Sequence, residues 1–301
     1  MKIKKLIPYL LIFLVGMLAG ATLYKVTKSK DDDIKVININ TNDSSFRPLP
    51  PPMKKEKDSE MKREFEKPKD EKEKIHLKKD FQGEMAILID DSGNSLELAR
   101  EFEKLGMPLS FAIIPYLSKS KETNEFFSSR GYTVLLHLPM EGSDEKTNSN
   151  TKNLLRESMS KEEIEDIFLK ALDNVGYVKG FNNHMGSKFT SSDRAMTNVL
   201  SIAKEKGMFY VDSKTIGNSK GFSKAKEMGI STAECIRFLD NSKKVEDIEK
   251  EIEKSMEIAR KRKKVLVIGH FHKNMVEALK NKKELVENSG IRLIFVSEIL
   301  E

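Results

Sequence analysis

The sequence predicts an α/β domain with a mainly parallel sheet and helices packed outside it. From Phe81 onward, short apolar runs of strand length alternate with longer segments whose apolar residues recur at helical spacing. Alternation of this kind is typical of parallel strands joined by crossover helices. The 301 residues leave room for one domain of about 200 to 220 residues plus extensions.

The elements are expected in a regular order along this domain. Apolar runs predict strands at residues 85–89, 109–114, 133–136, 208–211, 265–268 and 292–296. Spaced apolar residues predict helices at residues 96–105, 161–175, 195–206 and 245–262. Ser160 and Glu163 have the spacing of a capping box, and Gly106 and Gly207 follow helices where a left-handed cap is favoured.

The N-terminal residues 1–26 are predicted to be an export signal. Three lysines in residues 1–5 precede an uncharged stretch, residues 6–24, which at about 1.5 Å per residue would cross most of a bilayer. The length of this stretch and the flanking Lys25 and Lys28 favour an uncleaved signal anchor, whereas the small residues Ala19-Gly20-Ala21 favour a cleaved signal peptide. Both alternatives place the remainder outside the cytoplasm, because the stronger positive cluster precedes the apolar stretch.

Residues 27–80 are predicted to be a disordered, charged tether that leads to a catalytic domain at residues 81–301. The tether is rich in Asp, Asn, Ser, Lys and Glu, and Pro48, Pro50, Pro51 and Pro52 are almost consecutive. Such a segment buries too little apolar surface to offset its chain entropy.

The overall composition argues against a nucleic-acid-binding protein and against a disulfide-stabilised one. The net charge is +6, but lysine and glutamate are interleaved and no aromatic-studded basic stripe is present, so we expect no nucleic-acid partner. Cys235 is the only cysteine, so the chain has no intramolecular disulfide, and its apolar surroundings predict a small buried side chain.

Residues able to bind metal or transfer protons cluster after the predicted strands. The first strand ends in Asp90-Asp91-Ser92-Gly93, and four of the five histidines lie at or just after strand ends. Each position alone has an ordinary structural explanation, such as a turn or a helix N-cap at Asp90-Asp91-Ser92-Gly93. However, the carboxyl ends of parallel strands meet at one rim, where active sites form, so the recurrence of these residues predicts a site.

Metal-assisted hydrolysis is the chemistry that fits these residue types. One carboxylate and two neutral imidazoles are typical of a zinc site with open positions for water and substrate. A second carboxylate that is not a ligand can accept the proton of that water as general base. Asp90 and Asp91 could divide these roles, because neighbouring strand residues point in different directions. The sequence therefore predicts a divalent metal cofactor, with zinc favoured.

Six blocks resemble, in order, the divergent polysaccharide deacetylase family. They are Ile89-Asp90-Asp91-Ser92-Gly93, His137-Leu138-Pro139-Met140-Glu141, Asn183-His184-Met185-Gly186-Ser187, Val211-Asp212-Ser213-Lys214-Thr215, Phe238-Leu239-Asp240-Asn241 and Ile268-Gly269-His270. The resemblance covers residues 85–297. It implies a distorted (β/α) barrel with fewer strands than the eight-stranded form, and a metal-dependent esterase that removes acetyl groups from N-acetylated sugars.

The resemblance also implies roles for residues at the predicted metal site. Asp90 is expected to be the general base, and Asp91 and His137 are expected to be metal ligands. Position 141, where ordinary deacetylases have their second metal histidine, is Glu141 here. His184 is therefore inferred to be the third ligand from the pattern of this branch.

His270 resembles the late histidine that acts as general acid. Asp212 or Asp240 is expected to orient it, and His272 is expected to substitute for it or assist it. The remaining residues expected to bind substrate or to orient the site are Glu141, Asn183, Ser187 and Lys214.

We therefore expect an enzyme that deacetylates an N-acetylated or O-acetylated cell-envelope polysaccharide, such as a peptidoglycan-like polymer, and that is held at the membrane by its N-terminal segment. One alternative is an envelope carbohydrate-binding or scaffold protein that keeps the fold without hydrolysis. Another is a phosphoester hydrolase, for which Lys188 and Lys214 would suit a phosphate. The sequence has no Trp, so sugar stacking would fall to Phe or Tyr.

Overall fold

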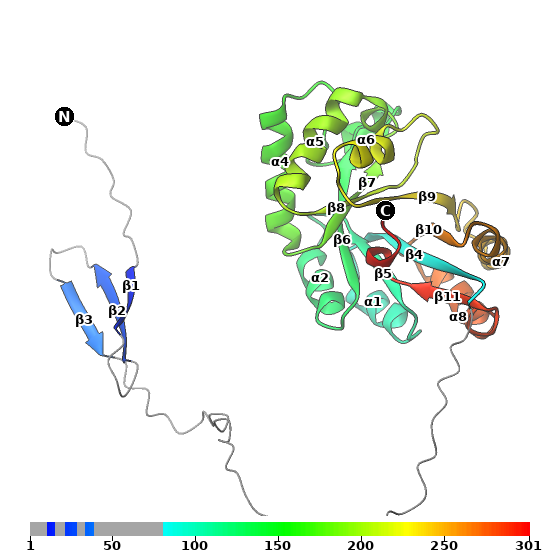
Figure 1. Cartoon of the computed structure of the whole chain (residues 1–301), viewed down its shortest axis with the longest axis horizontal. Coiled ribbons are helices and arrows are strands. Elements are labelled where there is room, and N and C mark those ends of the chain that lie inside the picture. Colours follow the sequence, from blue (N-terminus) through cyan, green and yellow to red (C-terminus); the bar gives the residue numbers. More distant parts are fainter. Residues whose placement is uncertain (1–10, 16–21, 29–33, 39–80) are drawn as a thin grey trace, which may run out of the picture. The chain divides into compact units, whose positions relative to one another are not determined.

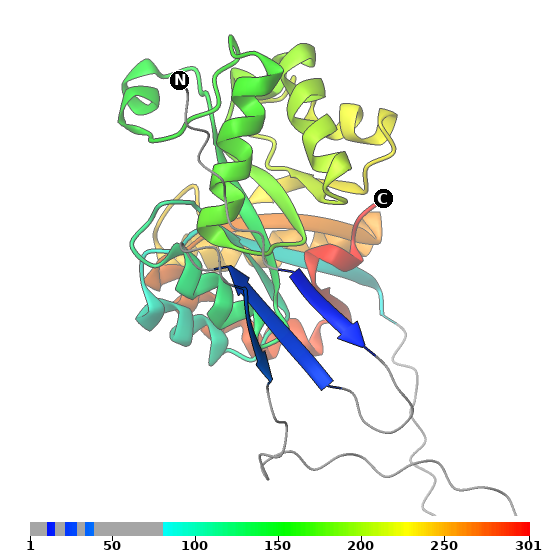
Figure 2. The same ribbon diagram turned by 90° about the vertical axis from the view of Figure 1, so that its left-hand side faces the viewer.

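The computed structural model describes residues 11–15, 22–28, 34–38 and 81–301. The chain divides into two units, residues 1–73 and 74–301, which we describe separately. In the first unit, β1 (Leu11–Val15), β2 (Thr22–Lys28) and β3 (Ile34–Asn38) form an antiparallel sheet (Figure 2).

The predicted membrane anchor lies only partly within the described residues. Where residues 6–24 are described, they belong to β1 and β2 rather than to a helix. Across all the described residues, no helix combines the length and the apolar character that a membrane span requires. The rest of the predicted anchor, and residues 39–80 of the predicted tether, lie outside the described residues.

In the second unit, seven parallel strands within residues 81–301 close into a barrel (Figures 1 and 2). They are β4 (Gly83–Ser92), β5 (Leu109–Ile113), β6 (Thr133–Met140), β7 (Gly180–Met185), β8 (Phe209–Asp212), β9 (Thr232–Phe238) and β10 (Lys264–His270). Each strand pairs with the next, and β10 closes the ring by pairing with β4. A further strand, β11 (Ile291–Ile294), pairs with the first half of β4. The expectation of a parallel barrel with fewer than eight strands is confirmed.

Helices connect these strands and lie outside the ring (Figure 1). They are α1 (Leu96–Glu103), α2 (Ser120–Ser128), α3 (Glu145–Asn150), α4 (Lys161–Val175), α5 (Asp193–Glu205), α6 (Gly221–Glu227), α7 (Val245–Arg262) and α8 (Lys273–Asn288), with 3₁₀ turns η1 (Phe189–Ser191) and η2 (Val296–Glu298). The predicted capping box of Ser160 and Glu163 is present at the start of α4. Gly106 and Gly207 adopt the predicted left-handed backbone, with φ of 60° and 66°.

Alternate residues of each strand pack on opposite sides of the barrel wall. On β4, Leu88 belongs to an interior cluster with Val211 of β8, whereas Ile87 and Ile89 belong to the larger cluster that the helices cover. Both faces are therefore buried, which explains why the strands are visible in the sequence as continuous apolar runs. Cys235 of β9 is in the interior cluster, and burial raises the pKa of its thiol, as expected for an unreactive side chain.

The C-terminal residues close the amino-terminal end of the barrel. The Val296 backbone N–H donates to Ser110 Oγ of β5 (3.0 Å), and Glu301 forms a pair of backbone hydrogen bonds with Thr232 of β9 (2.8 and 3.1 Å). Val296 and Ile299 also join the interior cluster. This end of the barrel is thus plugged, and the opposite end is the one at which the carboxyl ends of the strands meet.

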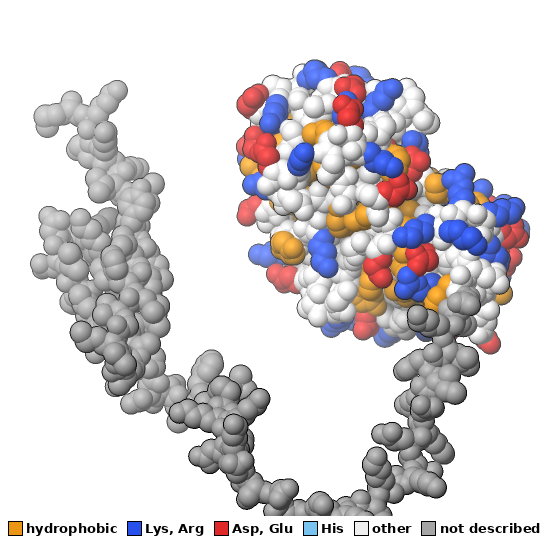
Figure 3. Space-filling model, viewed as in Figure 1, with side chains coloured by type: hydrophobic (Ala, Val, Ile, Leu, Met, Phe, Trp, Pro, Cys, Tyr) orange, Lys and Arg blue, Asp and Glu red, His pale blue; other side chains and the backbone are white. Residues whose placement is uncertain are grey.

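Charged side chains of both signs are mixed on the surface of the second unit. On the face seen in Figure 3, lysine and arginine side chains are interspersed with aspartate and glutamate. Among the described residues, several charged side chains form ion pairs, such as Lys282 of α8 with Glu253 of α7 (2.6 Å). The net positive charge of the sequence therefore does not form a continuous basic stripe on this face.

Candidate metal centre

A β-bulge brings the two adjacent aspartates of β4 to the carboxyl end of the barrel. Ile89 pairs with Phe111 and Ser92 pairs with Ile113, so two residues of β4, Asp90 and Asp91, oppose one residue of β5. Asp91 has a left-handed backbone with φ of 62°. In a regular strand the two carboxylates would point to opposite faces. The bulge instead allows both to reach the same histidine.

Three potential ligand atoms converge at this rim. Asp91 Oδ1 lies 3.2 Å from His137 Nε2 and 3.0 Å from His184 Nδ1, and the two imidazole nitrogens are 3.2 Å apart. Ligand atoms of a tetrahedral zinc ion would be about 3.4 Å apart, given metal–ligand distances near 2.1 Å. The triangle formed by these atoms is therefore close to the size that a metal ion requires.

The environment of Asp91 also fits a metal ligand. Its Oδ1 atom is buried and accepts no hydrogen bond of acceptable geometry from the described residues. Burial disfavours the charged form, but the imidazoles of His137 and His184 outweigh it and hold the pKa of this carboxyl well below its usual range. A buried, ionised carboxylate oxygen beside two imidazole nitrogens is a suitable donor for a divalent cation.

Asn182 of β7 fixes the tautomer of His137. Its Nδ2 donates to Asp90 Oδ1 (2.9 Å) and to Ser213 Oγ (3.0 Å), so the amide oxygen must face His137. His137 Nδ1 then carries the proton and donates it to Asn182 Oδ1 (2.8 Å). In the neutral form of the ring, Nε2 of His137 has its lone pair directed at Asp91 and His184, and this is the form that binds metal.

Asp90 lies beside this triangle and is almost completely buried, with 2% of its surface exposed. Its Oδ2 atom is 3.6 Å from His137 Nε2, and its Oδ1 atom accepts the hydrogen bond from Asn182. Burial raises the pKa of Asp90, with the neighbouring charge of Asp91 acting in the same direction and His137 in the opposite one. A raised pKa makes this carboxylate a stronger proton acceptor than an exposed aspartate.

A second histidine group lies next to Asp90 at the end of β10. His270 is the strand partner of Asp90, and its Nδ1 and backbone N–H donate to the two oxygens of Asp240 (2.8 and 2.9 Å). Burial lowers the pKa of His270, but the Asp240 carboxylate outweighs it and raises the pKa to about 9. His270 is therefore a cation at neutral pH.

His272 supports Asp240 from the other side. Its Nδ1 accepts the backbone N–H of Met275 at the start of α8 (3.2 Å), so its Nε2 carries the proton and donates to Asp240 Oδ2 (2.8 Å). Both ring nitrogens of His272 are thus engaged. This geometry favours a supporting role over substitution for His270.

Asp212 does not orient His270, contrary to one of the two expectations. Its oxygens accept hydrogen bonds from Ser219 Oγ (2.7 Å) and from the backbone N–H groups of Lys214 (2.9 Å) and Phe222 (3.0 Å). Asp212 leaves β8 on the outer face, because the interior position is taken by Val211. The carboxylate consequently braces the loop that leads to α6.

Three other candidate residues also make structural contacts around the rim. Asn183 Oδ1 accepts from Tyr210 Oη (3.0 Å), and Lys214 pairs with Glu234 (2.8 Å). Ser187 Oγ accepts the backbone N–H of Ser143 (2.8 Å). These contacts hold the loops that surround the metal triangle.

Glu141 is buried beside the rim and does not belong to the metal triangle. Its carboxylate accepts the backbone N–H of Glu157 (2.7 Å) and the ammonium of Lys188 (2.9 Å). Burial opposes ionisation, but these two partners outweigh it and lower the pKa of Glu141. The position at which ordinary deacetylases were expected to have a second ligand therefore holds a buried glutamate paired with the exposed Lys188. The second imidazole comes from β7.

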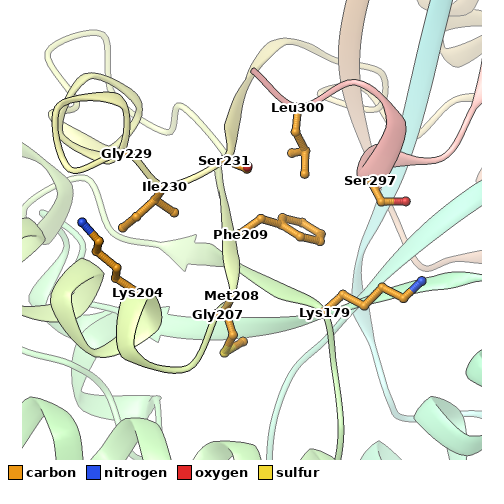
Figure 4. Close-up of a pocket in the computed structure, with 10 residues that line it drawn as sticks. All are labelled: Lys179, Lys204, Gly207, Met208, Phe209, Gly229, Ile230, Ser231, Ser297 and Leu300. Atoms are coloured by element: carbon orange, nitrogen blue, oxygen red, sulfur yellow. The ribbon is translucent and has the colours of Figure 1, made fainter.

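A pocket of about 380 Å³ opens at the opposite, plugged end of the barrel (Figure 4). Phe209, Ile230 and Leu300 point into it, and Lys179 and Lys204 flank it. The residues that line this pocket include no carboxylate and no histidine. It therefore does not supply the acid and base groups that converge at the other end.

Asn182 is the residue of this centre that the sequence analysis did not select. It is fully buried and joins Asp90, His137 and Ser213, which come from three different strands or strand ends. One signal was available, because Asn182 is two residues from His184 and therefore lies on the same face of the strand.

Comparisons with known proteins identify the family and the fold of this domain. A family model described as divergent polysaccharide deacetylase matches residues 87–300. The uncharacterized protein YibQ of Escherichia coli is 35% identical over 222 residues, which cover 72% of this chain and 67% of that protein. An uncharacterized protein of Haemophilus influenzae is 32% identical over 199 residues, covering 66% and 70% of the two chains. Among solved structures, an uncharacterized protein from Agrobacterium tumefaciens shares the fold with a TM-score of 0.67 at 16% identity, covering 72% of this chain and 88% of that one.

Proposed function

The chain belongs to the divergent polysaccharide deacetylase family, and we propose that it is a metal-dependent hydrolase that removes acetyl groups from an acetylated cell-envelope polysaccharide. The observation that carries the proposal is the triangle of Asp91, His137 and His184, with Asp90 and His270 next to it. These groups supply the metal ligands, a base and an acid within one rim.

We assign the metal to Asp91 Oδ1, His137 Nε2 and His184 Nδ1, with zinc as the ion that this donor set suits best. A divalent ion bound there would polarise the acetyl carbonyl and lower the pKa of a water molecule toward about 7. Asn182 keeps His137 in the tautomer that this role requires, because its amide oxygen holds the Nδ1 proton.

Asp90 is the proposed general base. Its Oδ2 atom borders the triangle, while the hydrogen bond from Asn182 to Oδ1 holds the carboxylate in one orientation. In this position it would accept the proton of the attacking water. The raised pKa of the buried carboxyl brings its basicity closer to that required at neutral pH.

His270 is the proposed general acid. With its pKa near 9 it is protonated at neutral pH, and Asp240 holds its Nδ1 side. Nε2 is then the nitrogen from which a proton would pass to the departing amine or alcohol. Asp90 and His270 thus take opposite roles. Burial raises the pKa of the Asp90 carboxyl, which makes it a better base, and the Asp240 carboxylate raises the pKa of His270, which keeps it protonated as an acid.

We also propose that the protein acts outside the cytoplasm and is held at the membrane by residues 1–26. The support for this comes from the lysines in residues 1–5 and the uncharged residues 6–24. Mass measurement of the protein in the membrane fraction would test it. A protein that retains residues 1–24 fits an anchor, and a mature chain that begins after Ala21 in the secreted fraction would replace the anchor with a cleaved signal.

The central experiment measures acetate release and metal content of the purified full-length protein. Acetylated peptidoglycan and oligomers of N-acetylglucosamine are the substrates, and Asp90→Asn is the key variant. We expect acetate from the wild type and none from Asp90→Asn, with equal bound metal in both. Joint loss of metal and activity would make Asp90 a ligand, and bound metal with no acetate from any acetylated polymer would overturn the proposed reaction.

A further inference from the structure

A surface pocket beside the loop between β5 and α2 has the composition of a sugar-binding subsite. It is lined by Tyr116, Asn153, Asp166, Leu169, Lys170, Asp173 and Asn174 and has a volume of about 540 Å³. Tyr116 belongs to the loop between β5 and α2, and most of the other residues belong to α4. The proposed catalytic groups do not include any of these residues.

The loop that carries Tyr116 is fastened to the strand that carries the metal ligand. The Ile114 backbone N–H donates to the Ser92 carbonyl (3.0 Å), and the Lys119 N–H donates to the Gly93 carbonyl (2.9 Å). Ser92 directly follows Asp91. Two Cα steps of about 3.8 Å separate Tyr116 from Ile114, and paired strands lie about 5 Å apart, so Tyr116 is within about 13 Å of Ser92.

Gly93 permits this close approach. Its φ is 123°, and a Cβ atom at this position would lie 3.3 Å from the Ile114 carbonyl oxygen and 3.3 Å from Ser120 Cα. A larger residue would therefore push the loop away from the end of β4. Ser120 Oγ braces the loop by donating to the Ile114 carbonyl (2.7 Å) and accepting the Leu117 N–H (2.9 Å).

Tyr116 is held in a strained conformation and is partly exposed. Its φ is 66°, which is rare for an aromatic residue, and its N–H donates to Asn174 Oδ1 of α4 (2.6 Å). The residue is 37% exposed, which makes it one of the few exposed large apolar or aromatic residues in the described chain. Strained residues held by specific contacts are concentrated at ligand sites.

The charges of the pocket disfavour an anionic ligand. Asp166 forms an ion pair with Lys170 (2.7 Å), so its charge is already balanced. Asp173 is exposed and makes no hydrogen bond or ion pair with the described residues, so its oxygens are available to accept from hydroxyl groups. One uncompensated carboxylate disfavours phosphates and other anions.

We propose that this pocket binds a neutral hexose unit of the substrate polymer, at a distance of a short oligosaccharide from the metal centre. Tyr116 and Leu169 offer an apolar surface to the face of a sugar ring, while Asp173, Asn153 and Asn174 surround it with polar groups. The inference rests on the proposed function for the identity of the polymer. It would make the enzyme prefer polymers over monosaccharides.

Binding of the N-acetylglucosamine tetramer tests this subsite without requiring turnover. Calorimetric titration would use the full-length protein carrying Asp90→Asn, alone and combined with Tyr116→Gly, Tyr116→Phe or Phe81→Ala. Tyr116→Gly removes the ring, and because glycine adopts positive φ freely, the melting temperature should not fall. Phe81→Ala is the matched control, since this exposed aromatic precedes β4 at the opposite end of the barrel.

We expect Tyr116→Gly to weaken tetramer binding by about tenfold or more. Tyr116→Phe and Phe81→Ala should bind like the parent. Unchanged binding by Tyr116→Gly, or absence of tetramer binding by the parent, would overturn the subsite. Acetate release is measured separately on the wild type. Tetramer binding that depends on Tyr116, without acetate release, would refute the proposed hydrolase activity but still support the sugar-binding subsite.

Discussion

Replacing Asp240 by asparagine should move the alkaline limit of activity to lower pH. In the wild type, the Asp240 carboxylate accepts from both Nδ1 and the backbone N–H of His270, and it is the main group that raises the pKa of this histidine to about 9. Asparagine is nearly isosteric but carries no charge. The pKa of His270 should therefore fall toward the ordinary value of about 6.5.

The size of the effect follows from these two values. A general acid works only while it is protonated, so its rate contribution is lost as pH rises through its pKa. At pH 8 about nine-tenths of His270 is protonated with a pKa near 9, whereas about 3% is protonated with a pKa near 6.5. Asp240→Asn should therefore lower kcat/KM about thirtyfold at pH 8 and less than about twofold at pH 6.

The assay is acetate release by the full-length protein between pH 5.5 and about 10, with bound metal quantified at each pH. His272→Asn is the matched control, because asparagine still caps α8 through Met275 while the contact between His270 and Asp240 remains. Its alkaline limit should stay near pH 9. An Asp240→Asn profile that declines equally at pH 6 and pH 8, or keeps its limit near 9, would refute the assignment of His270 as the acid held by Asp240.

Three further outcomes are expected. Asn182→Leu should weaken Zn²⁺ binding by about 10- to 100-fold in a competitive chelator titration, because His137 loses the partner of its Nδ1 proton. A variant with wild-type Zn²⁺ affinity would show that Asn182 does not set the tautomer of His137. Asp91→Gly should abolish tight Zn²⁺ binding in the same titration. It should preserve the melting temperature measured in chelator, because glycine adopts a φ of 62° without strain. Retained tight binding would mean that Asp91 is not a ligand. Gly180→Ala should lower the free energy of unfolding by about 1–3 kcal/mol, because the new Cβ would lie 2.5 Å from the Phe209 ring. Gly217→Ala is the control, because its new Cβ would meet no atom within 4 Å. Equal urea midpoints of the two variants would contradict this packing.

The sequence predicted the order of strands and helices wherever the local pattern was strong. Buried strands such as β4 and β10 have uninterrupted apolar cores, and the helix α4 begins with a capping box. β6 was predicted to end at Leu136, but it continues to Met140 through Pro139. Pairing with β7 and with Leu155 maintains the strand there, and such long-range pairing has no local signal.

β7 shows why part of the candidate site could not be predicted. Its sequence, Gly180-Phe181-Asn182-Asn183-His184-Met185, has few apolar residues, because the positions that face the rim hold Asn182 and His184 instead of core residues. The residues that weaken the strand pattern are thus the ones that build the site. The bulge at Asp90 and Asp91 could not be predicted from the local sequence either, because it depends on the register of β4 against β5.

The position of β4 in the sheet has a consequence for how the domain opens. Its first half pairs with β11 on one edge, its second half pairs with β5, and its other edge pairs with β10 along Lys264–His270. A strand that is hydrogen-bonded along both edges and buried on both faces cannot separate from the sheet without breaking its pairing with neighbouring strands. We expect the amide hydrogens of β4 to be among the last to exchange with solvent, so that Asp90 and Asp91 keep their positions through local openings of the surrounding loops and are lost only when the whole barrel unfolds.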